Sequence, residues 1–121
     1  MPLVKQNLNA MGHVHGGVYA SLIDAADAWA HYCELDEEVG FTTIDLHVDD
    51  LARSQLGLLL CEGHPVKVGR TICLAEASVI RDDGKQVAYG TSKCFVSEAL
   101  PNTIQDLSKL YGSPLPAKFL K

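Results

Sequence analysis

The sequence predicts an α+β fold in which one long, largely buried helix packs against an antiparallel sheet. The run from Val18 to Tyr32 is rich in small, aliphatic and aromatic residues, which is typical of a helix buried on most sides. The segments after it are short, apolar and separated by turn residues, which is typical of antiparallel strands. Because the 121 residues contain no Ser/Gly/Pro-rich linker, we expect one domain spanning residues 1–121.

The helix and the first strand are expected early in the chain. A short extended segment over residues 4–9 leads through a loop at Gly12 to the helix, which we expect over residues 16–33. The first strand is expected over residues 41–51, where apolar and polar residues alternate with a period of two. The alternation predicts one face with Ile44, Leu46 and Val48 and an opposite face with Thr43, Asp45, His47 and Asp49.

Three further strands and a short helix are expected after this strand. The strands are expected over residues 56–68, 71–81 and 86–97. The last two are joined by Asp82-Asp83-Gly84, which predicts a hairpin because these residue types tolerate a positive φ angle. Asn102, with Gln105 three residues later, has the pattern of a capping box and predicts a short helix at the start of the tail, about residues 102–121.

Composition and charge exclude several classes of function. The net charge is −5 and the ten Lys and Arg residues are scattered, so we expect no nucleic-acid partner. No apolar run approaches the roughly 18 residues of a membrane span, and Met1 to Lys5 lacks a signal-peptide core, so a cytoplasmic protein without membrane contact is expected. The acids at Asp36 to Glu38 and at Asp49 to Asp50 are expected to be solvated loop charges.

The stretch from Asn9 to Asp24 contains an amide, an imidazole, two glycines and a carboxylate within sixteen residues. If the helix begins near Gly16, its first N–H groups have no partners within the helix, and the helix dipole adds partial positive charge there. Such a turn can stabilise the oxyanion that forms during acyl transfer. The alternative is that His15-Gly16-Gly17 is only a tight helix start.

Asp24 is the candidate catalytic carboxylate, because burying an unpaired acid in an apolar helix is costly. It could attack a carbonyl directly or activate a water molecule, and the sequence leaves both routes open. It could also be purely structural, held by a hydroxyl such as that of Thr43. Asp27, one turn later, is expected to pair with His31 at i+4.

Metal and nucleophilic serine or cysteine chemistry are not expected. The five histidines lack a metal-binding register, and the cysteines lack paired spacing, so we expect no metal site and no disulfide framework. The chain has no G-x-S-x-G elbow around a serine. The four cysteines, expected to be reduced core thiols, are Cys33, Cys61, Cys73 and Cys94.

The order of motifs resembles that of the hotdog-fold acyl-CoA thioesterases of the phenylacetate-pathway type, over about residues 3–96. The resemblance rests on the Asn9 to Asp24 spacing, a Thr-Thr-Ile-Asp-Leu strand, a Val-Gly-Arg-Thr turn and an Asp-Gly-Lys-Gln-Val-Ala hairpin. It implies a hotdog fold, with a long central helix wrapped by an antiparallel sheet. It also implies a homodimer or homotetramer that joins its sheets and hydrolyses acyl-CoA at the subunit interface, with CoA as part of the substrate and no separate cofactor.

The resemblance also implies roles for individual residues. The Gly16 N–H would polarise the thioester carbonyl, His15 would orient that turn, and Asn9 would position water or the thioester. Asp24 would be the nucleophile or general base, and Thr43 would assist it. The implied turn near the CoA phosphates is Gly69, Arg70 and Thr71, although an arginine in a hairpin is often only solvated.

The chain departs from this family at its start, and other functions compete with hydrolysis. Relatives commonly carry a further helix and strand before the asparagine, whereas eight residues precede Asn9, so we expect a sheet lacking an edge and a more open acyl pocket. One alternative is a non-catalytic acyl-CoA-binding hotdog module, which would have no need of Asp24. Another is a hotdog hydratase or dehydratase, although its His-Phe-Pro-Gly type of motif is absent from the sequence.

Overall fold

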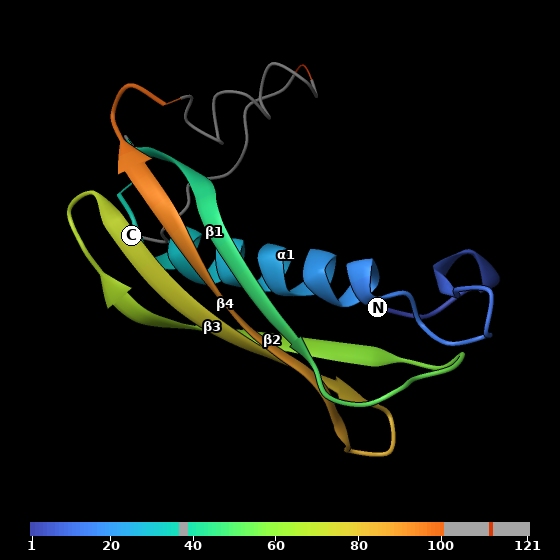
Figure 1. Cartoon of the computed structure of the whole chain (residues 1–121). Helices are drawn as coiled ribbons and strands as arrows, with labels where there is room; N and C mark the ends of the chain where they lie inside the picture. The colour runs from blue at the N-terminus through green and yellow to red at the C-terminus, as the bar shows by residue number, and fades with distance from the viewer. Residues whose placement is uncertain (37–38, 101–111, 113–121) are drawn as a thin grey trace.

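The computed structural model describes residues 1–36, 39–100 and 112, which form one helix packed on one sheet. Helix α1 covers Gly16–Glu34, and the short 3-10 turn η1 covers Lys5–Asn7. The strands are β1 (Gly40–Asp50), β2 (Leu59–Val68), β3 (Ile72–Arg81) and β4 (Gln86–Ser97). They pair antiparallel in the order β1-β4-β3-β2, and Figure 1 shows α1 lying along one face of the curved sheet. The predicted α+β class is confirmed.

Most expected elements appear close to their predicted positions. The hairpin between β3 and β4 forms as expected, with Gly84 at φ 86° and its N–H donating to the carbonyl of Arg81 at 2.9 Å. Residues 5–7 form a 3-10 turn instead of an extended segment, because the Asn7 side chain folds back to accept the Val4 N–H at 2.8 Å. The predicted helix at residue 102 lies outside the described residues.

Strand β2 begins later than predicted because its start pairs with the N-terminus of the chain. The Leu59 N–H donates to the carbonyl of Met1 at 2.9 Å, and the Leu3 N–H donates to the carbonyl of Gly57 at 2.8 Å. Pro2 and Leu58 form an isolated antiparallel bridge between these bonds. The first three residues therefore cover the beginning of the β2 edge, where the sequence led us to expect an uncovered one.

A β-bulge in β1 changes the predicted orientation of its side chains. The pairing with β4 runs from Thr43↔Cys94 directly to Asp45↔Lys93, so Ile44 is the extra residue. The simple alternation assigned Thr43 and Leu46 to opposite faces. With one residue bulged out, both lie on the face that packs against α1, because their partners Cys94 and Ser92 are buried there. This part of the sequence-based prediction is wrong, since the bulge shifts the period of two by one residue.

The helix approaches the sheet closely because small residues face it. A Cβ atom added to Gly63 would lie 2.5 Å from the carbonyl oxygen of Ala26, so this β2 position accepts only glycine without backbone movement. Ala75 and Ala77 on β3 are also fully or almost fully buried. The close packing explains why the side chains on the helix face that meets the sheet are buried.

Two polar side chains lie on that buried face. Tyr19, Ile23, Asp27 and His31 follow one another at intervals of four and are all buried, with Asp27 at 0% exposure and His31 at 2%. Neither carboxylate oxygen of Asp27 and neither ring nitrogen of His31 has a hydrogen-bond partner, so the expected Asp27–His31 pair does not form. Both side chains point at the sheet instead of at each other. Burial raises the pKa of Asp27 to about 6, and the nearby Ser92 hydroxyl offsets part of this effect without reaching hydrogen-bond geometry.

The raised pKa of Asp27 predicts a pH-dependent loss of stability that Asp27→Asn should remove. Because the folded-state pKa exceeds the ordinary value of 3.8 for an aspartate, the folded state holds this proton more tightly than the unfolded state. Below about pH 4, where Asp27 is protonated in both states, its burial does not change the free energy of unfolding with pH. The free energy of unfolding then falls as the pH rises from about 4 to about 6, and it stays constant above that range. A shift of about two pKa units corresponds to about 3 kcal/mol.

The measurement is urea unfolding of wild type and Asp27→Asn at several pH values from 4 to 7. We expect wild type to lose stability relative to the variant across this interval. Asp36→Asn, which removes an exposed carboxylate just after the helix, is the matched control and should follow wild type. Parallel pH profiles for wild type and Asp27→Asn would contradict the assignment.

Candidate functional site

The start of α1 presents an unpaired N–H group. His15 is the N-cap, and its Nδ1 accepts the Gly17 N–H at 2.9 Å, which leaves the ring proton on Nε2. The Val18 N–H donates to the His15 carbonyl at 2.9 Å. Within the described residues, the Gly16 N–H has no hydrogen-bond acceptor. The predicted orienting contact of His15 is present, and Gly16 is left free to bind a ligand oxygen.

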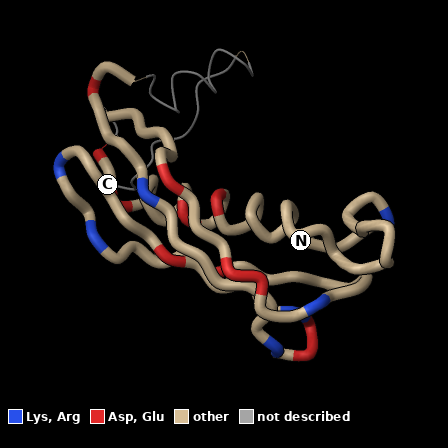
Figure 2. The backbone as a smooth tube through the Cα atoms, in the orientation of Figure 1, with Lys and Arg blue, Asp and Glu red and all other residues tan. Residues whose placement is uncertain are grey.

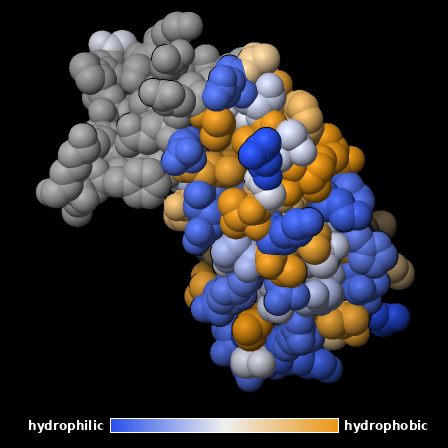
Figure 3. Space-filling model, turned by 90° about the vertical axis from the view of Figure 1, so that its left-hand side faces the viewer, coloured by the Kyte–Doolittle hydropathy of each residue, from blue (hydrophilic) through white to orange (hydrophobic). Residues whose placement is uncertain are grey.

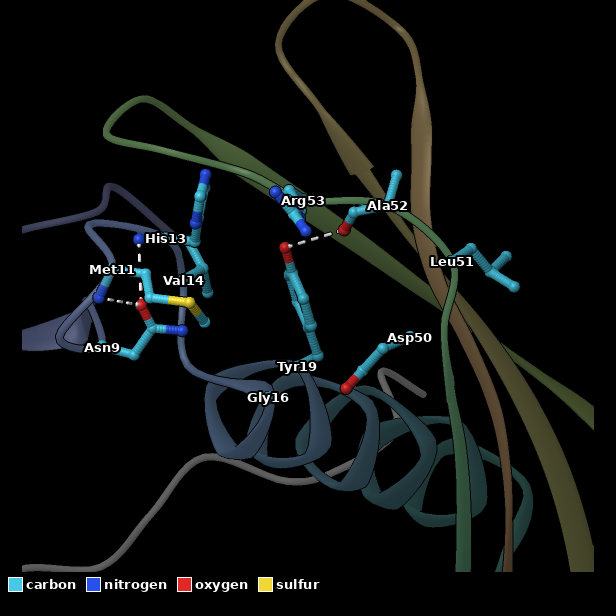
Figure 4. A pocket seen from close by; sticks show the side chains of 10 residues that line it. All are labelled: Asn9, Met11, His13, Val14, Gly16, Tyr19, Asp50, Leu51, Ala52 and Arg53. Carbon is cyan, nitrogen blue, oxygen red and sulfur yellow. Dashed lines mark hydrogen bonds between the residues drawn. The ribbon is translucent and has the colours of Figure 1, made fainter.

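Asn9 organises the loop that leads into this helix. Its Oδ1 accepts the N–H groups of Met11 at 2.9 Å and His13 at 3.2 Å, and its own N–H donates to the His13 carbonyl at 2.7 Å. Figure 4 shows that these bonds hold the amide oxygen toward the loop, which leaves the amide nitrogen as the side chain's available donor. Asn9 and Gly16 therefore offer two N–H donors at the same end of the molecule.

A cavity of about 410 Å³ opens between this loop, the start of α1 and the segment that follows β1. The Tyr19 hydroxyl crosses it to donate to the Ala52 carbonyl at 3.4 Å (Figure 4). Polar and apolar residues both line it: Asn9, Met11, His13, Val14, Gly16, Tyr19, Asp50, Leu51, Ala52 and Arg53. The cavity can thus accommodate an apolar group close to the free Gly16 N–H.

Asp50 is a site residue that sequence reasoning missed. It is exposed, as expected of a solvated charge, but it belongs to β1 and not to a loop. It ends the strand opposite the buried Ala88 and lies beside the start of α1. A Cβ atom added to Gly16 would be 2.8 Å from its Oδ2, so the carboxylate packs directly against this glycine. The alternation of residues along the strand indicated this position, because Leu46, Val48 and Asp50 fall on one face.

Asp24 and Thr43 form a separate pair. The Thr43 hydroxyl donates to Asp24 Oδ1 at 2.9 Å, a contact that the β1 bulge permits by turning Thr43 toward the helix. Asp24 is half-buried and is not among the residues that line the cavity at Gly16. Eight residues of helix separate it from Gly16, which corresponds to roughly 12 Å along the axis. One chain therefore brings together Asn9, His15 and Gly16, and separately Asp24 and Thr43.

The turn Gly69-Arg70-Thr71 lies at the opposite end of α1 from Gly16. It lines a second cavity of about 570 Å³ together with Glu34, the last residue of the helix. The full helix separates this region from Gly16 by about 27 Å. Glu34, Asp36 and Glu98 give the cavity an acidic border, and Figure 2 shows the basic residues scattered over the chain and not gathered at one site. Within one chain, the turn is not close to the Gly16 end of the helix.

The comparisons with known proteins point to one family. Residues 11–88, more than half of the chain, match the thioesterase superfamily. Human acyl-coenzyme A thioesterase 13 is 26% identical over 92 residues, which cover 74% of this chain and 65% of that protein. A provisionally named esterase of Halobacterium salinarum is 42% identical over 71 residues, which cover 57% of this chain and 46% of that protein. The chain thus spans about half to two thirds of the length of these curated relatives.

Solved structures agree in fold. A Bacillus halodurans protein crystallised with CoA superposes with a TM-score of 0.76 at 28% identity, covering 80% of this chain and 68% of that one. A Haemophilus influenzae thioesterase superposes with a TM-score of 0.78 at 20% identity, covering 85% and 72%, and shows likeness of fold alone. Within the described residues, no helix is both long and apolar enough to cross a membrane. With the helix packed on its antiparallel sheet and the match over residues 11–88, this chain belongs to the thioesterase superfamily and has its hotdog fold.

Proposed function

We propose that this protein hydrolyses an acyl-CoA thioester to a free acid and CoA at a site shared by two subunits. The observation that carries the proposal is the unpaired Gly16 N–H at the start of α1, beside a cavity that can accept an acyl group. The CoA bound to the related Bacillus halodurans protein and the name of acyl-coenzyme A thioesterase 13 support CoA as the carrier.

The Gly16 N–H would donate to the thioester carbonyl oxygen and stabilise the negative charge that develops on it. The His15 side chain fixes this turn through its bond to Gly17, so the donor is already oriented before substrate binds. The Asn9 amide is a second donor for the carbonyl oxygen or for a water molecule. In this proposal the residues at the helix start act on the oxygen of the carbonyl group.

Asp24 would act on the carbonyl carbon. It either attacks the carbon to give an enzyme anhydride, which water then hydrolyses, or removes a proton from a water molecule that attacks. In both routes the C–S bond breaks, CoA leaves as the thiolate and takes up a proton, and one water is consumed. Thr43 would hold the carboxylate through its 2.9 Å hydrogen bond.

The distance along α1 supports a shared site. A carbonyl group can contact Gly16 or Asp24 of one chain, but not both across roughly 12 Å. Within the described residues, strand β1 is one of the two edges of the sheet, and it carries exposed apolar residues, with Ile44 at 55% and Leu46 at 38% exposure. Figure 3 shows further apolar side chains exposed among hydrophilic ones on one side of the molecule. A dimer that joins two β1 edges would pair Gly16 of one subunit with Asp24 of the other.

CoA contacts from Gly69, Arg70 and Thr71 form part of the same proposal. Because this turn is about 27 Å along α1 from Gly16 of its own chain, the subunit that binds the carbonyl oxygen is not the one whose turn would contact CoA. Arg70 is exposed, so the Arg70 side chain of one subunit can reach a phosphate of CoA whose carbonyl is bound at Gly16 of the other subunit.

Asp24→Asn should lower kcat/KM for acyl-CoA hydrolysis by at least about 100-fold, the loss expected on removing a nucleophile or general base. Thr43→Ala should cost about tenfold or less, because water can partly replace a hydroxyl that orients a carboxylate. The assay is release of free thiol from a panel of acyl-CoAs. Asp82→Asn, at an exposed hairpin position, is the control. A folded Asp24→Asn protein with wild-type turnover would rule out the assignment.

Asp50→Asn should raise kcat/KM by about two- to tenfold. The Asp50 carboxylate lies beside Gly16, where its charge opposes the oxyanion, and removing an interaction of about 1 kcal/mol gives this change. The measurement is the same thiol assay at low and high salt, since screening should shrink the difference. A loss of 100-fold would instead put the Asp50 carboxylate in the chemical step in place of Asp24.

Mixing two inactive variants tests the shared site. Gly16→Pro removes the N–H donor at the first helical position, where proline is tolerated, and His15 already has the extended ψ of 135° that a residue before proline requires. The flexible end of Asp50 must shift to admit the ring. After subunit exchange with Asp24→Asn, half of the dimers are mixed and each has one intact site, so about a quarter of wild-type activity should return.

Each variant alone is the control for this mixture, and mass spectrometry of labelled subunits monitors exchange. If both variants are folded and exchange, but the mixture stays inactive, the two groups act within one chain and the shared-site arrangement is wrong.

A further inference from the structure

Three ligand-type side chains meet in the core at a distance from the proposed catalytic groups. His31 comes from the last turns of α1, Cys73 from β3 and Cys94 from β4, and the two cysteines pair directly across the strands. One donor atom from each lies within 4.8 Å of the other two. Their exposures are 2%, 0% and 0%. The three residues are far apart along the chain, so no local spacing predicts the cluster, and the sequence led us to expect no metal site.

His31 has no hydrogen-bond partner for either ring nitrogen. A buried imidazole normally donates through one nitrogen and accepts through the other, so leaving both unpaired costs free energy. The neighbouring side chains are apolar, since Leu35 and Val96 are buried beside the cysteines and the Phe41 ring lies 6.3 Å from the imidazole centroid. Among the described residues, the polar groups beside the imidazole are the Ser92 backbone, which does not reach hydrogen-bond geometry, and the two thiols.

We propose that His31, Cys73 and Cys94 bind a divalent cation of the zinc class. On binding, each thiol releases a proton to solvent and forms a sulfur–metal bond, while a ring nitrogen of His31 donates its lone pair. Two thiolates balance the charge of the cation, so no net charge is placed among the apolar residues. This balance favours a divalent ion over copper(I), because two thiolates around a singly charged ion would leave one net negative charge in the core.

The distances suit this chemistry after a small contraction. Zinc bonds of about 2.3 Å to sulfur and about 2.0 Å to nitrogen hold tetrahedral donors roughly 3.5 to 4 Å apart. Donors that already lie within 4.8 Å need to move inward by less than about 1 Å each to reach that spacing. Cys73 would exchange its weak bond to the Gly69 carbonyl, 3.6 Å long, for the metal. A water molecule would take the fourth position.

A disulfide between Cys73 and Cys94 would account for fewer of these residues than a metal does. The two cysteines are direct cross-strand partners, and the Cα separation of about 5.5 Å in a hydrogen-bonded pair lies within the range of disulfides, so the strand geometry permits one. A disulfide would leave His31 unsatisfied, whereas a metal explains all three residues.

Cobalt(II) is the probe, because thiolate ligation gives it an ultraviolet charge-transfer band and tetrahedral geometry gives it strong visible bands. We expect the metal-free, reduced protein to bind one cobalt with both signatures and to lose them when zinc is added. Cys73→Ser and Cys94→Ser should abolish the charge-transfer band or weaken it by at least half, and His31→Gln should weaken binding at least tenfold. Cys33→Ser (exposed) and Cys61→Ser (half-buried) are matched controls and should bind normally.

A second measurement uses only the wild-type chain, in case the core variants fail to fold. Zinc should raise the midpoint of thermal unfolding and slow alkylation of Cys73 and Cys94, but not that of Cys33, as read by mass spectrometry. The proposal is overturned if reduced, folded wild type gives no thiolate–cobalt band. It is also overturned if the control variants abolish the band, if copper(I) binds while cobalt and zinc do not, or if the only change found is a Cys73–Cys94 disulfide.

Discussion

One extra residue in β1 determines which side chains of that strand reach helix α1. The bulge at Ile44 lets Thr43 face the helix, where its hydroxyl meets Asp24, and keeps Leu46 on the same side. From Leu46 this face continues in steps of two residues and ends at Asp50, which lies beside Gly16. Without the bulge, either Thr43 or Asp50 would turn to the outer face, because a shift of one residue reverses every later side chain. Both contacts between β1 and the helix depend on this irregularity.

Helix length is the second constraint on function. A straight helix holds Gly16 and Asp24 roughly 12 Å apart, so no side-chain rotation can bring both to one carbonyl group. The close approach of α1 to the sheet at Gly63 holds the helix against the strands. In the proposed function, the two groups would therefore act on one carbonyl only across two subunits, and the β1 edge of the sheet lies next to Thr43 and Asp24.

The two halves of α1 face different environments. Its first half borders an open cavity, with an unpaired N–H at Gly16 and a carboxylate nearby. Its second half buries Asp27 and His31 against small residues of the sheet, where neither finds a hydrogen-bond partner. Burial without partners is costly, so these two residues call for an explanation that packing alone does not supply. For His31, the two cysteines beneath it offer donor atoms within 4.8 Å, so a shared ligand is the explanation proposed above.

The sequence by itself determined the features that depend on neighbours along the chain. The α+β class, the start of α1 at Gly16 and the Asp82 to Gly84 hairpin all follow from local periodicity and turn chemistry, and the structure confirms them. The role of His15 in this turn was implied only by the family resemblance. The Asp24–Thr43 contact was one of two readings that the sequence left open. Only the tertiary structure decided the bulge at Ile44, the position of Asp50 and the meeting of His31 with Cys73 and Cys94. The physical reason is that a repeat pattern gives the face of a residue relative to its neighbours, whereas strand register depends on long-range pairing that no local pattern encodes.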